Sequence, residues 1–281
     1  MQDHIFGYTK QQVPVIGQGT WNIEQGERKD AIKALRRGLD LGMRHIDTAE
    51  MYGSGAAEEI IGEAIGGRRD EVFLVSKVLP SNASRAGTIA ACERSLKRLK
   101  TDRLDCYLLH WRGSYKLEET FAAFDELHSK GKIRSWGVSN FNAGDLYEAL
   151  AIAGKGRIAC NQVLYHLKER AIEHEVIPWC EREGVAVVGY SPFGQRNFPE
   201  PQSKGGRVLD EICKSHKATA RQVALAFLTR NKNLFVIPKS VRIQHTEDNA
   251  GAGELKLTAD DIARIDKAFS PGPKRRELPM I

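Results

Sequence analysis

The sequence predicts an α/β fold, a (β/α)8 barrel of the TIM type with an N-terminal β-hairpin and extra loops or helices at the C-terminal side. Short apolar runs recur along the chain, amphipathic stretches of helical period separate them, and no linker divides them. Apolar strands separated by helices form a parallel sheet that helices cover. Eight such units in 281 residues fit one closed barrel, a single domain over residues 1–281, better than an open doubly wound sheet.

Eight apolar runs are the predicted strands. In order they are VIGQGTW from Val15, HID at 45–47, VFLVSK from Val72, LDCYLLH from Leu104, IRSWGVS from Ile133, IACNQV from Ile158, VAVVGYSP from Val185 and LFVIPKS from Leu234. Among the predicted helices are residues 28–42, 85–100, 117–132, 143–156 and 172–184. Gly42, Gly131 and Gly184 are placed where a left-handed residue ends a helix.

Three segments lie outside the repeating pattern of strands and helices. Residues 1–14 precede the first strand and are expected to form a hairpin that closes the bottom of the barrel. Residues 191–204 follow the seventh strand and are expected to cross the top as a long loop. Residues 258–281 are expected to follow the last helix.

Charge is spread along the chain. The 42 basic and 36 acidic residues leave a formal net charge of +6, and the longest basic cluster is the short GPKRR near the end. Nucleic-acid binding requires positive charge gathered on one face, so we expect no nucleic-acid partner. The start of the chain lacks a secretion signal, and no run of about 18 apolar residues occurs, so a cytoplasmic protein without membrane contact is expected.

The five cysteines are an odd number and widely spaced, without a C-x-x-C pair. They are predicted to be reduced and mostly buried, and no metal site is expected.

Polar residues follow most of the predicted strands. In a barrel of this kind, side chains at the C-terminal ends of the strands face the active site. The candidates are Asp47, Tyr52, Lys77, His110, Ser139, Asn140, Asn161, Gln162, Tyr190, Ser191, Lys239 and Ser240. Each alone fits an ordinary strand terminus, so it is the combination on successive strands that indicates a site.

An aspartate, a tyrosine, a lysine and a histidine in one pocket can deliver a proton to a carbonyl. A free phenol has a pKa of about 10, and a neighbouring ammonium lowers that value. Lys77 could act on Tyr52 in this way, with Asp47 holding Lys77 and His110 donating a hydrogen bond to the substrate oxygen. Such a site lacks a hydride source, so a cofactor is required.

Seven motifs in order resemble the aldo-keto reductase family: HIDTAEMYG, VFLVSKV, DCYLLHW, GKIRSWGVSNF, NQVLYH, GYSPFG and VIPKSV. They span nearly the whole chain. The resemblance implies that Asp47, Tyr52, Lys77 and His110 form a catalytic tetrad, with Tyr52 as general acid in reduction and general base in the reverse reaction.

The resemblance also implies NADP(H), with NADH as a weaker alternative, extended across the top of the barrel. Ser139, Asn140 and Gln162 would hold the carboxamide, Tyr190 would stack on the nicotinamide, residues 191–194 would pass the pyrophosphate, and Lys239 and Ser240 would meet the ribose phosphate. The implied cofactor contacts are Gly19, Thr20, Trp21, Asp47, Ser139, Asn140, Gln162, Tyr190, Ser191, Phe193, Gly194, Ile237, Lys239, Ser240, Val241, His245 and Asn249. The implied substrate contacts are Trp21, Tyr52, His110 and Trp111.

Two departures from the family pattern affect these expectations. His245 stands where many members carry an arginine, with Arg242 nearby as a substitute, and NADP(H) remains the expected cofactor because Lys239 is kept. The tail is short, so a more open pocket is expected, walled by Trp21, Trp111 and Phe193. The GQGTWN and GSGAAE stretches each lack the third glycine of a Rossmann fingerprint.

Two functions of different class follow. One is an NADPH-dependent reductase of small aldehydes or ketones, including dicarbonyls and sugar-derived carbonyls, acting as a monomer on a small-molecule substrate. The alternative is a non-catalytic NADP(H)-binding or structural or regulatory protein on the same barrel. The presence of all four tetrad residues favours the enzyme.

Overall fold

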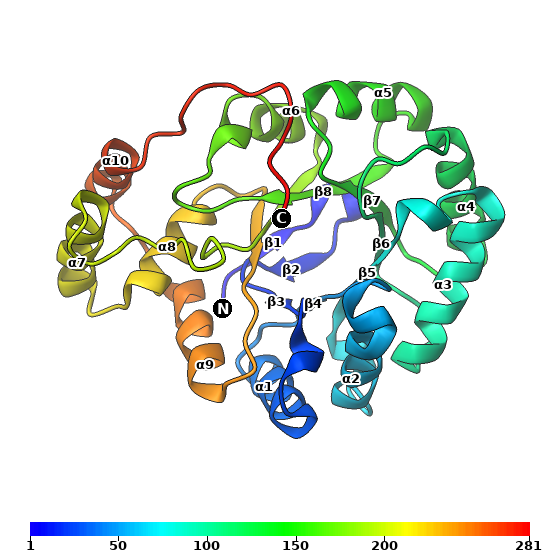
Figure 1. Ribbon diagram of the computed structural model, residues 1–281, viewed down its shortest axis with the longest axis horizontal. Coiled ribbons are helices and arrows are strands. Elements are labelled where there is room, and N and C mark those ends of the chain that lie inside the picture. The colour runs from blue at the N-terminus through cyan, green and yellow to red at the C-terminus, as the bar shows by residue number, and fades with distance from the viewer.

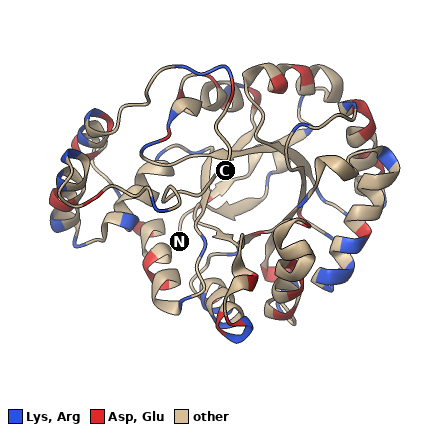
Figure 2. Ribbon diagram, viewed as in Figure 1, with Lys and Arg blue, Asp and Glu red and all other residues tan.

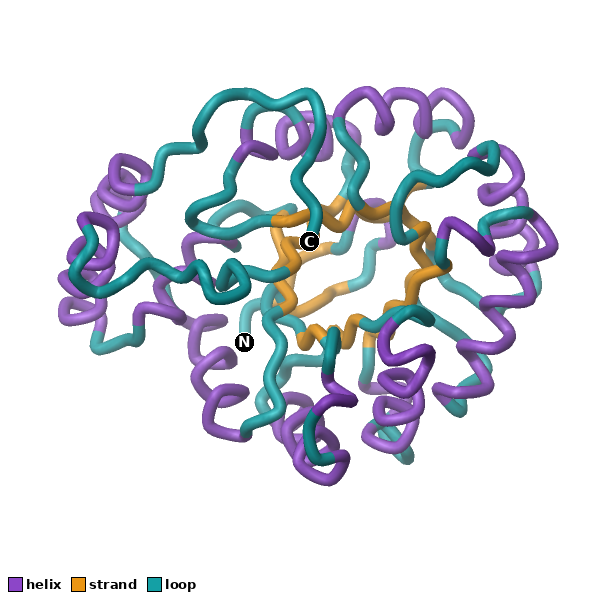
Figure 3. Tube along the Cα trace, in the orientation of Figure 1, coloured by secondary structure: helices purple, strands orange, loops and turns teal.

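Eight parallel strands form a ring in the order of the sequence (Figure 3). The computed structural model describes residues 1–281. The strands of the ring are β3 (Gln18–Gly19), β4 (His45–Asp47), β5 (Phe73–Val78), β6 (Cys106–Leu109), β7 (Trp136–Ser139), β8 (Ile158–Leu164), β9 (Ala186–Tyr190) and β10 (Leu234–Ile237). All eight lie within or overlap the predicted runs.

The ring is closed between its first and last strands. The Gly17 N–H donates to the Val236 carbonyl at 2.8 Å, the Val236 N–H donates to the Val15 carbonyl at 2.9 Å, and the Gly19 N–H donates to the Pro238 carbonyl at 3.1 Å. These parallel bridges satisfy backbone groups that an open sheet would leave at its edges. The prediction of a barrel is therefore confirmed.

Ten helices cover the outside of the ring (Figure 1). They are α1 (Arg28–Asp40), α2 (Ala56–Ala64), α3 (Arg85–Leu99), α4 (Leu117–Ser129), α5 (Ala143–Ala153), α6 (Val176–Glu183), α7 (Lys204–His216), α8 (Ala220–Leu228), α9 (Ile243–Gly251) and α10 (Ala259–Ala268). Gly42, Gly131 and Gly184 have φ values of 86°, 70° and 68°, as predicted for left-handed helix ends.

One expectation about the C-terminal region is wrong. Residues 258–281 were expected to follow the last helix, but residues 259–268 form α10. Thr258 and Asp261 form a capping box at its start, in which each side chain accepts a hydrogen bond from the other residue's backbone N–H. This T-x-x-D pattern is the sequence signal that predicts the helix.

The N-terminal hairpin closes the bottom of the barrel, as predicted. Its strands β1 (Asp3–Ile5) and β2 (Gln12–Pro14) pair antiparallel. The phenyl group of Phe6 lies beneath the barrel, next to aromatic side chains at the starts of β4, β5 and β10. Its ring centroid is 5.9 Å from that of His45, 4.8 Å from that of Phe73 and 5.1 Å from that of Phe235. Gly7 follows with φ +54°, and a Cβ there would lie 2.2 Å from the Ala159 oxygen, so only glycine fits.

The core fills the ring and the layer between strands and helices. Every residue of β4 to β8 and of β10 is buried. The charged residues lie mainly on the outer helices and loops (Figure 2). Four of the five cysteines are buried thiols and Cys213 is half-buried. The helices are all too short or too polar to cross a lipid bilayer.

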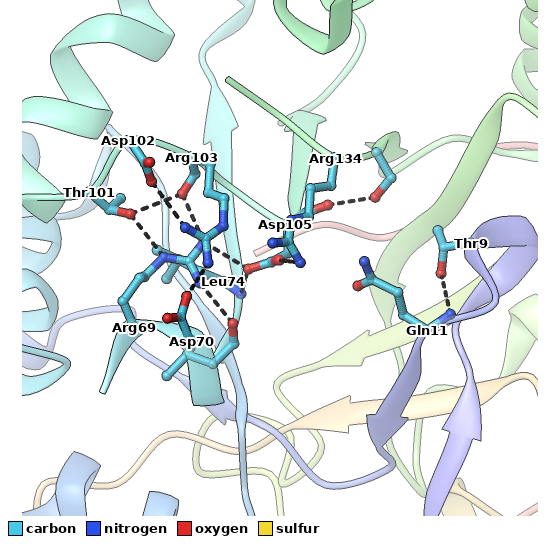
Figure 4. A network of polar contacts seen from close by, with 12 residues as sticks. Thr9, Gln11, Arg69, Asp70, Leu74, Thr101, Asp102, Arg103, Asp105 and Arg134 are labelled. Carbon is cyan, nitrogen blue, oxygen red and sulfur yellow. Dashed lines mark hydrogen bonds and ion pairs between the residues drawn. The ribbon is translucent and has the colours of Figure 1, made fainter. Parts of the chain in front are cut away.

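A polar network ties the lower ends of β5, β6 and β7 together, away from the top of the barrel (Figure 4). Asp105, immediately before β6, accepts hydrogen bonds from the Leu74 N–H at 2.9 Å and from Arg69 at 2.8 Å, and it lies 3.4 Å from Arg134. Arg69 also donates to the Arg103 carbonyl at 2.8 Å. Because Asp105 is 3% exposed, these bonds compensate for the burial of its charge.

Candidate active site

A cavity of about 770 Å³ opens at the C-terminal ends of the strands. Polar side chains at the ends of β4, β7 and β8 share its wall with aromatic side chains from the loops. Of the residues predicted from the sequence to be in the site, the cavity is lined by Gly19, Thr20, Trp21, Asp47, Tyr52, His110, Trp111, Ser139, Asn140, Gln162, Tyr190, Ser191, Phe193, Ile237 and Lys239.

Lys77 lies fully buried beneath the cavity and uses all three of its donors. The Lys77 Nζ is 2.5 Å from Asp47 Oδ1, 2.8 Å from the Thr48 carbonyl and 3.4 Å from the Tyr52 hydroxyl. Burial by itself lowers the pKa of Lys77, but Asp47 and Tyr52 reverse that effect and leave the pKa above its ordinary value. Lys77 is therefore an ammonium held against the phenol.

Burial also acts on the two partners of Lys77. It raises the pKa of Asp47, and the attraction of Lys77 and the hydrogen bonds from Lys77 and Gln162 offset part of that rise. The pKa of Tyr52 is likewise raised above its ordinary value by burial, and the opposing effect of Lys77 does not cancel it. Sequence reasoning expected a lowered phenol pKa. In this structure the lysine acts in the expected direction, and burial outweighs it.

His110 stands on the other side of Tyr52. The two ring centroids lie 5.8 Å apart at an interplanar angle of 75°, and the Trp111 ring packs 4.8 Å from His110. Burial, with a smaller contribution from Lys77, lowers the pKa of His110 to about 2. The imidazole is therefore neutral at physiological pH and can donate one hydrogen bond into the cavity.

A second group of polar side chains fixes the opposite wall. The Tyr190 hydroxyl donates to Asn140 Oδ1 at 2.9 Å, and Asn140 Nδ2 donates to the His110 carbonyl at 3.1 Å. Gln162 Nε2 donates to Asp47 Oδ2 at 2.7 Å, so this amide already holds the aspartate that pairs with Lys77. Asn140 has φ +61°, a strained value for a residue other than glycine.

Some predicted residues do not line the cavity. Asn161 hydrogen-bonds the backbone of Phe141, a structural contact. Lys77 acts from below the cavity floor. The remaining residues lie beside the cavity or on α9 and do not border it: Gly194, Ser240, Val241, His245 and Asn249.

Lys239 is the cavity's cation at the β10 side. Its side chain is exposed, and no carboxylate lies within 4.0 Å of it. Burial lowers the pKa of Lys239, and the nearby Glu24 opposes that shift. A cation at the cavity wall without a bonded acid suits a phosphate, so the cavity's donor set fits a phosphorylated dinucleotide.

Sequence reasoning missed part of the cavity wall. Pro192, within the predicted segment 191–194, also lines the cavity, and the unpredicted lining residues are Asn22, Met51, Gln195, Arg196, Met280 and Ile281. Met280 and Ile281 reach the cavity because the segment after α10 crosses the top of the molecule and returns to the barrel mouth (Figure 1). The final residues are hydrophobic, which is a sequence signal that they pack against the protein. The neighbouring sequence does not indicate which surface they contact. Nowhere do three or more His, Cys, Asp or Glu side chains converge as metal ligands would.

Comparisons with known proteins agree with this geometry. A family model described as the aldo/keto reductase family matches residues 15–269. Methylglyoxal reductase YeaE from Escherichia coli (strain K12) is 46% identical over 264 residues, which cover 93% of each protein. Glyoxal reductase from Bacillus subtilis (strain 168) is 33% identical over 273 residues, covering 95% of this chain and 94% of that protein.

Solved structures match over the full length. A crystal structure of an aldo/keto reductase from Klebsiella pneumoniae in complex with NADP and acetate has a TM-score of 0.92 and 40% identity, covering 100% of both chains. A crystal structure of an aldo-keto reductase from the same organism in complex with NADPH gives the same identity, coverage and TM-score.

Proposed function

The chain belongs to the aldo/keto reductase family, and from that premise we propose that it reduces small dicarbonyl aldehydes such as methylglyoxal with NADPH. It is an NADP-dependent oxidoreductase, and its reaction is carbonyl reduction. The single observation that carries the proposal is the contact of the buried Lys77 ammonium with both Asp47 and the Tyr52 hydroxyl at the cavity floor.

Tyr52 is the proton donor in this proposal. Its phenol is raised in pKa and therefore protonated before reaction, as an acid must be. As the carbonyl oxygen gains negative charge, the Tyr52 proton moves to it, and the adjacent Lys77 ammonium stabilises the phenolate left behind. Asp47, held by Gln162, keeps Lys77 in place.

The neutral His110 orients the carbonyl. A neutral imidazole that donates one hydrogen bond polarises the oxygen and does not compete with Tyr52 for proton delivery. When bound, the nicotinamide cofactor supplies the hydride. The carboxamide would contact the Asn140 and Ser139 side of the cavity, and the phosphate on the adenosine ribose would meet Lys239.

The cavity wall and the named relatives support a small substrate. Trp21, Trp111, Met280 and Ile281 bring apolar side chains to the mouth. Two of the relatives are named methylglyoxal reductase and glyoxal reductase. A small dicarbonyl leaves these side chains in place and presents one carbonyl to Tyr52 and His110.

Replacing Tyr52 by phenylalanine tests the assignment. We expect NADPH oxidation with methylglyoxal to fall by about 10³-fold, since general acid catalysis contributes on that order. The dissociation constant for NADPH, measured by fluorescence titration, should stay within about twofold, because no phosphate contact is removed. Turnover equal to that of the unmodified chain would rule out Tyr52 as the proton donor.

The same assay decides between the enzyme and a binding protein. NADPH oxidation is followed with methylglyoxal, glyoxal, simple ketones and sugars, with NADH in parallel. Cofactor binding without turnover of any carbonyl would favour the non-catalytic alternative. That alternative does not explain why Lys77 is bonded to both Asp47 and Tyr52.

A further inference from the structure

Glu50 is a buried carboxylate that the proposed mechanism does not use. It lies two residues before Tyr52 in the loop after β4, is 8% exposed and does not line the cavity. Its Oε1 accepts hydrogen bonds from the Leu79 N–H at 2.8 Å and from Asn82 Nδ2 at 2.9 Å. Its Oε2 lies 3.5 Å from Arg94. Because a buried carboxylate is costly without such donors, these contacts determine where the Glu50 side chain lies.

The contacts of Glu50 join the loop that carries Tyr52 to the strand that carries Lys77. Lys77 lies in β5, and Leu79 directly follows the end of that strand. The Glu50 N–H also donates to the Lys77 carbonyl, at 3.4 Å. The backbone and the side chain of Glu50 therefore hold the loop after β4 against the end of β5 at two neighbouring points.

The loop beyond Glu50 has an irregular backbone. The Tyr52 N–H donates to the Ala49 carbonyl at 3.1 Å, within the loop itself. Gly53 and Ser54 follow in the left-handed region, with φ values of 54° and 53°, and this conformation is strained for serine. Local backbone preference therefore does not hold Tyr52 in place, and contacts with neighbouring elements are needed to do so.

We propose that Glu50 is a positioning residue, whose carboxylate fixes the loop after β4 on the end of β5 and so keeps the Tyr52 hydroxyl against the Lys77 ammonium. The inference rests on the proposed function, in which Tyr52 is the proton donor. The Tyr52 hydroxyl and Lys77 Nζ are 3.4 Å apart, so a shift of about 1 Å would break their contact. Burial, Lys77 and Asp47 are what shift the pKa of Tyr52, so Glu50 acts through geometry and not through its charge.

The same anchor extends to the loop after β6, which follows His110. Asn82, a partner of Glu50, ends the short helix η5 (Pro80–Asn82). A Cβ at Gly113 would lie 2.6 Å from Pro80 Cβ, so the loop after β6 packs directly on η5. Glu50 therefore lies where the loops after β4, β5 and β6 meet, and these strands and loops carry Tyr52, Lys77 and His110.

The experiment compares kcat and KM for methylglyoxal, at saturating NADPH, in three variants of the full-length chain. Glu50→Ala removes the acceptor oxygens, and kcat should fall about 100-fold, the effect of displacing a catalytic group by about 1 Å. Glu50→Gln keeps an acceptor oxygen for Leu79 and Asn82 and should retain kcat within about threefold. Glu50→Asp keeps the charge but is one methylene shorter, so kcat should fall about tenfold. KM and the dissociation constant for NADPH should stay within about twofold, because Glu50 does not line the cavity.

Asp105→Ala is the matched control. Asp105 is also a buried carboxylate that accepts a backbone N–H of β5, that of Leu74 at 2.9 Å, but it lies at the bottom of the barrel. Its loss should lower the melting temperature and leave kcat within about twofold. Melting temperatures establish which variants are folded, and if Glu50→Ala does not fold, the contrast between Glu50→Gln and Glu50→Asp decides.

Three results would overturn the positioning role: a folded Glu50→Ala with kcat within about threefold of the unmodified chain, equal losses of kcat in Glu50→Ala and Asp105→Ala, or a Glu50→Asp more active than Glu50→Gln. The last result would show that the charge matters and not the length of the side chain. Full turnover by Tyr52→Phe would instead contradict the proposed function itself. An inactive Tyr52→Phe beside a fully active Glu50→Ala would contradict the positioning role alone, so the two failures are distinguishable.

Discussion

Lys77 shows how a single buried residue organises the site. Its three donors contact a carboxylate, a carbonyl and a phenol, so the ammonium has no freedom to reorient. Removal of any one partner would leave a buried charge imperfectly compensated. Because burial raises the pKa of Tyr52, the proposed reaction would start from a protonated phenol, and Lys77 would contribute most when the phenolate forms.

The neutral state of His110 leads to a pH prediction. With its pKa lowered to about 2, His110 stays neutral between pH 5 and pH 8, so its ionisation does not affect the rate in that range. At saturating NADPH, kcat for methylglyoxal should show no inflection near pH 6.5. His110→Gln, which keeps a neutral donor, should have the same profile with kcat lower by about tenfold. An inflection in the unmodified enzyme that His110→Gln lacks would contradict this assignment.

Lys239 leads to a prediction on cofactor choice. Lys239→Met replaces the cation with a neutral side chain of similar length. The dissociation constant for NADPH should therefore rise by about 10- to 100-fold, and that for NADH should stay within about twofold. The measurement is the same fluorescence titration. Equal losses for both cofactors would show that Lys239 does not contact the ribose phosphate.

At the scale of elements, the segment after α10 is placed by a buried arginine. Arg170, 2% exposed, donates to the Phe269 carbonyl, to Asp266 at the end of α10 and to Glu173 at 2.7 Å. Farther along, Lys274 pairs with Glu175 at 2.7 Å and His174 contacts the Gly272 carbonyl at 2.8 Å. These contacts lead the chain across the top, so that Met280 and Ile281 reach the cavity.

Shortening these two side chains should change substrate selection. In Met280→Ala/Ile281→Ala the mouth is wider, and kcat/KM for a bulky aromatic aldehyde should rise by roughly tenfold relative to methylglyoxal. The absolute value for methylglyoxal should change less than about threefold, since a small substrate leaves that wall unfilled. Parallel assays with the two aldehydes measure the ratio. An unchanged ratio would show that the segment does not border bound substrate.

At the scale of the whole molecule, the two ends of the barrel have separate tasks. The bottom holds the Phe6 ring, the Asp105 network and His45, whose two ring nitrogens are buried without hydrogen-bond partners. The top holds the cavity. Substitutions at the bottom should therefore alter stability and leave catalysis largely unchanged.

His45→Leu tests this separation through the pH dependence of stability. Burial and Lys77 lower the pKa of His45 to about 3, whereas in the unfolded chain it is about 6.5. Between these values the unfolded state binds the proton and the native state does not, so stability falls as pH decreases. From pH 7 to pH 4 the variant should lose roughly 3 kcal/mol less unfolding free energy than the unmodified chain.

Urea unfolding at the two pH values provides the comparison. At pH 7 the variant should be about as stable as the unmodified chain. Leucine is of similar size to histidine, and the substitution removes two buried ring nitrogens that have no hydrogen-bond partner. Its kcat for methylglyoxal at pH 7 should be unchanged. An identical loss of stability on acidification in both proteins would show that His45 does not titrate on unfolding as inferred.

Periodicity was enough to predict the ring of strands, and the polar residue that ends each strand was enough to predict which side chains meet. Asp47 and Lys77 lie on β4 and β5, and His110 directly follows β6, so barrel geometry brings these positions together. The bond from Gln162 to Asp47 could not be predicted this way, since it joins strands that are not adjacent. The return of Met280 to the cavity likewise depends on long-range packing.

The bridge between the first and last strands has a consequence for synthesis of the chain. β3 consists of two residues, and one of its flanks is completed only by the Val236 and Pro238 carbonyls near the other end of the sequence. During translation the ring cannot close until β10 has emerged, so the nascent chain exposes an unpaired strand edge for most of its synthesis. Gly19 and Lys239 face each other across that last joint and border the same cavity. This part of the cavity therefore forms only after β10 has joined the ring.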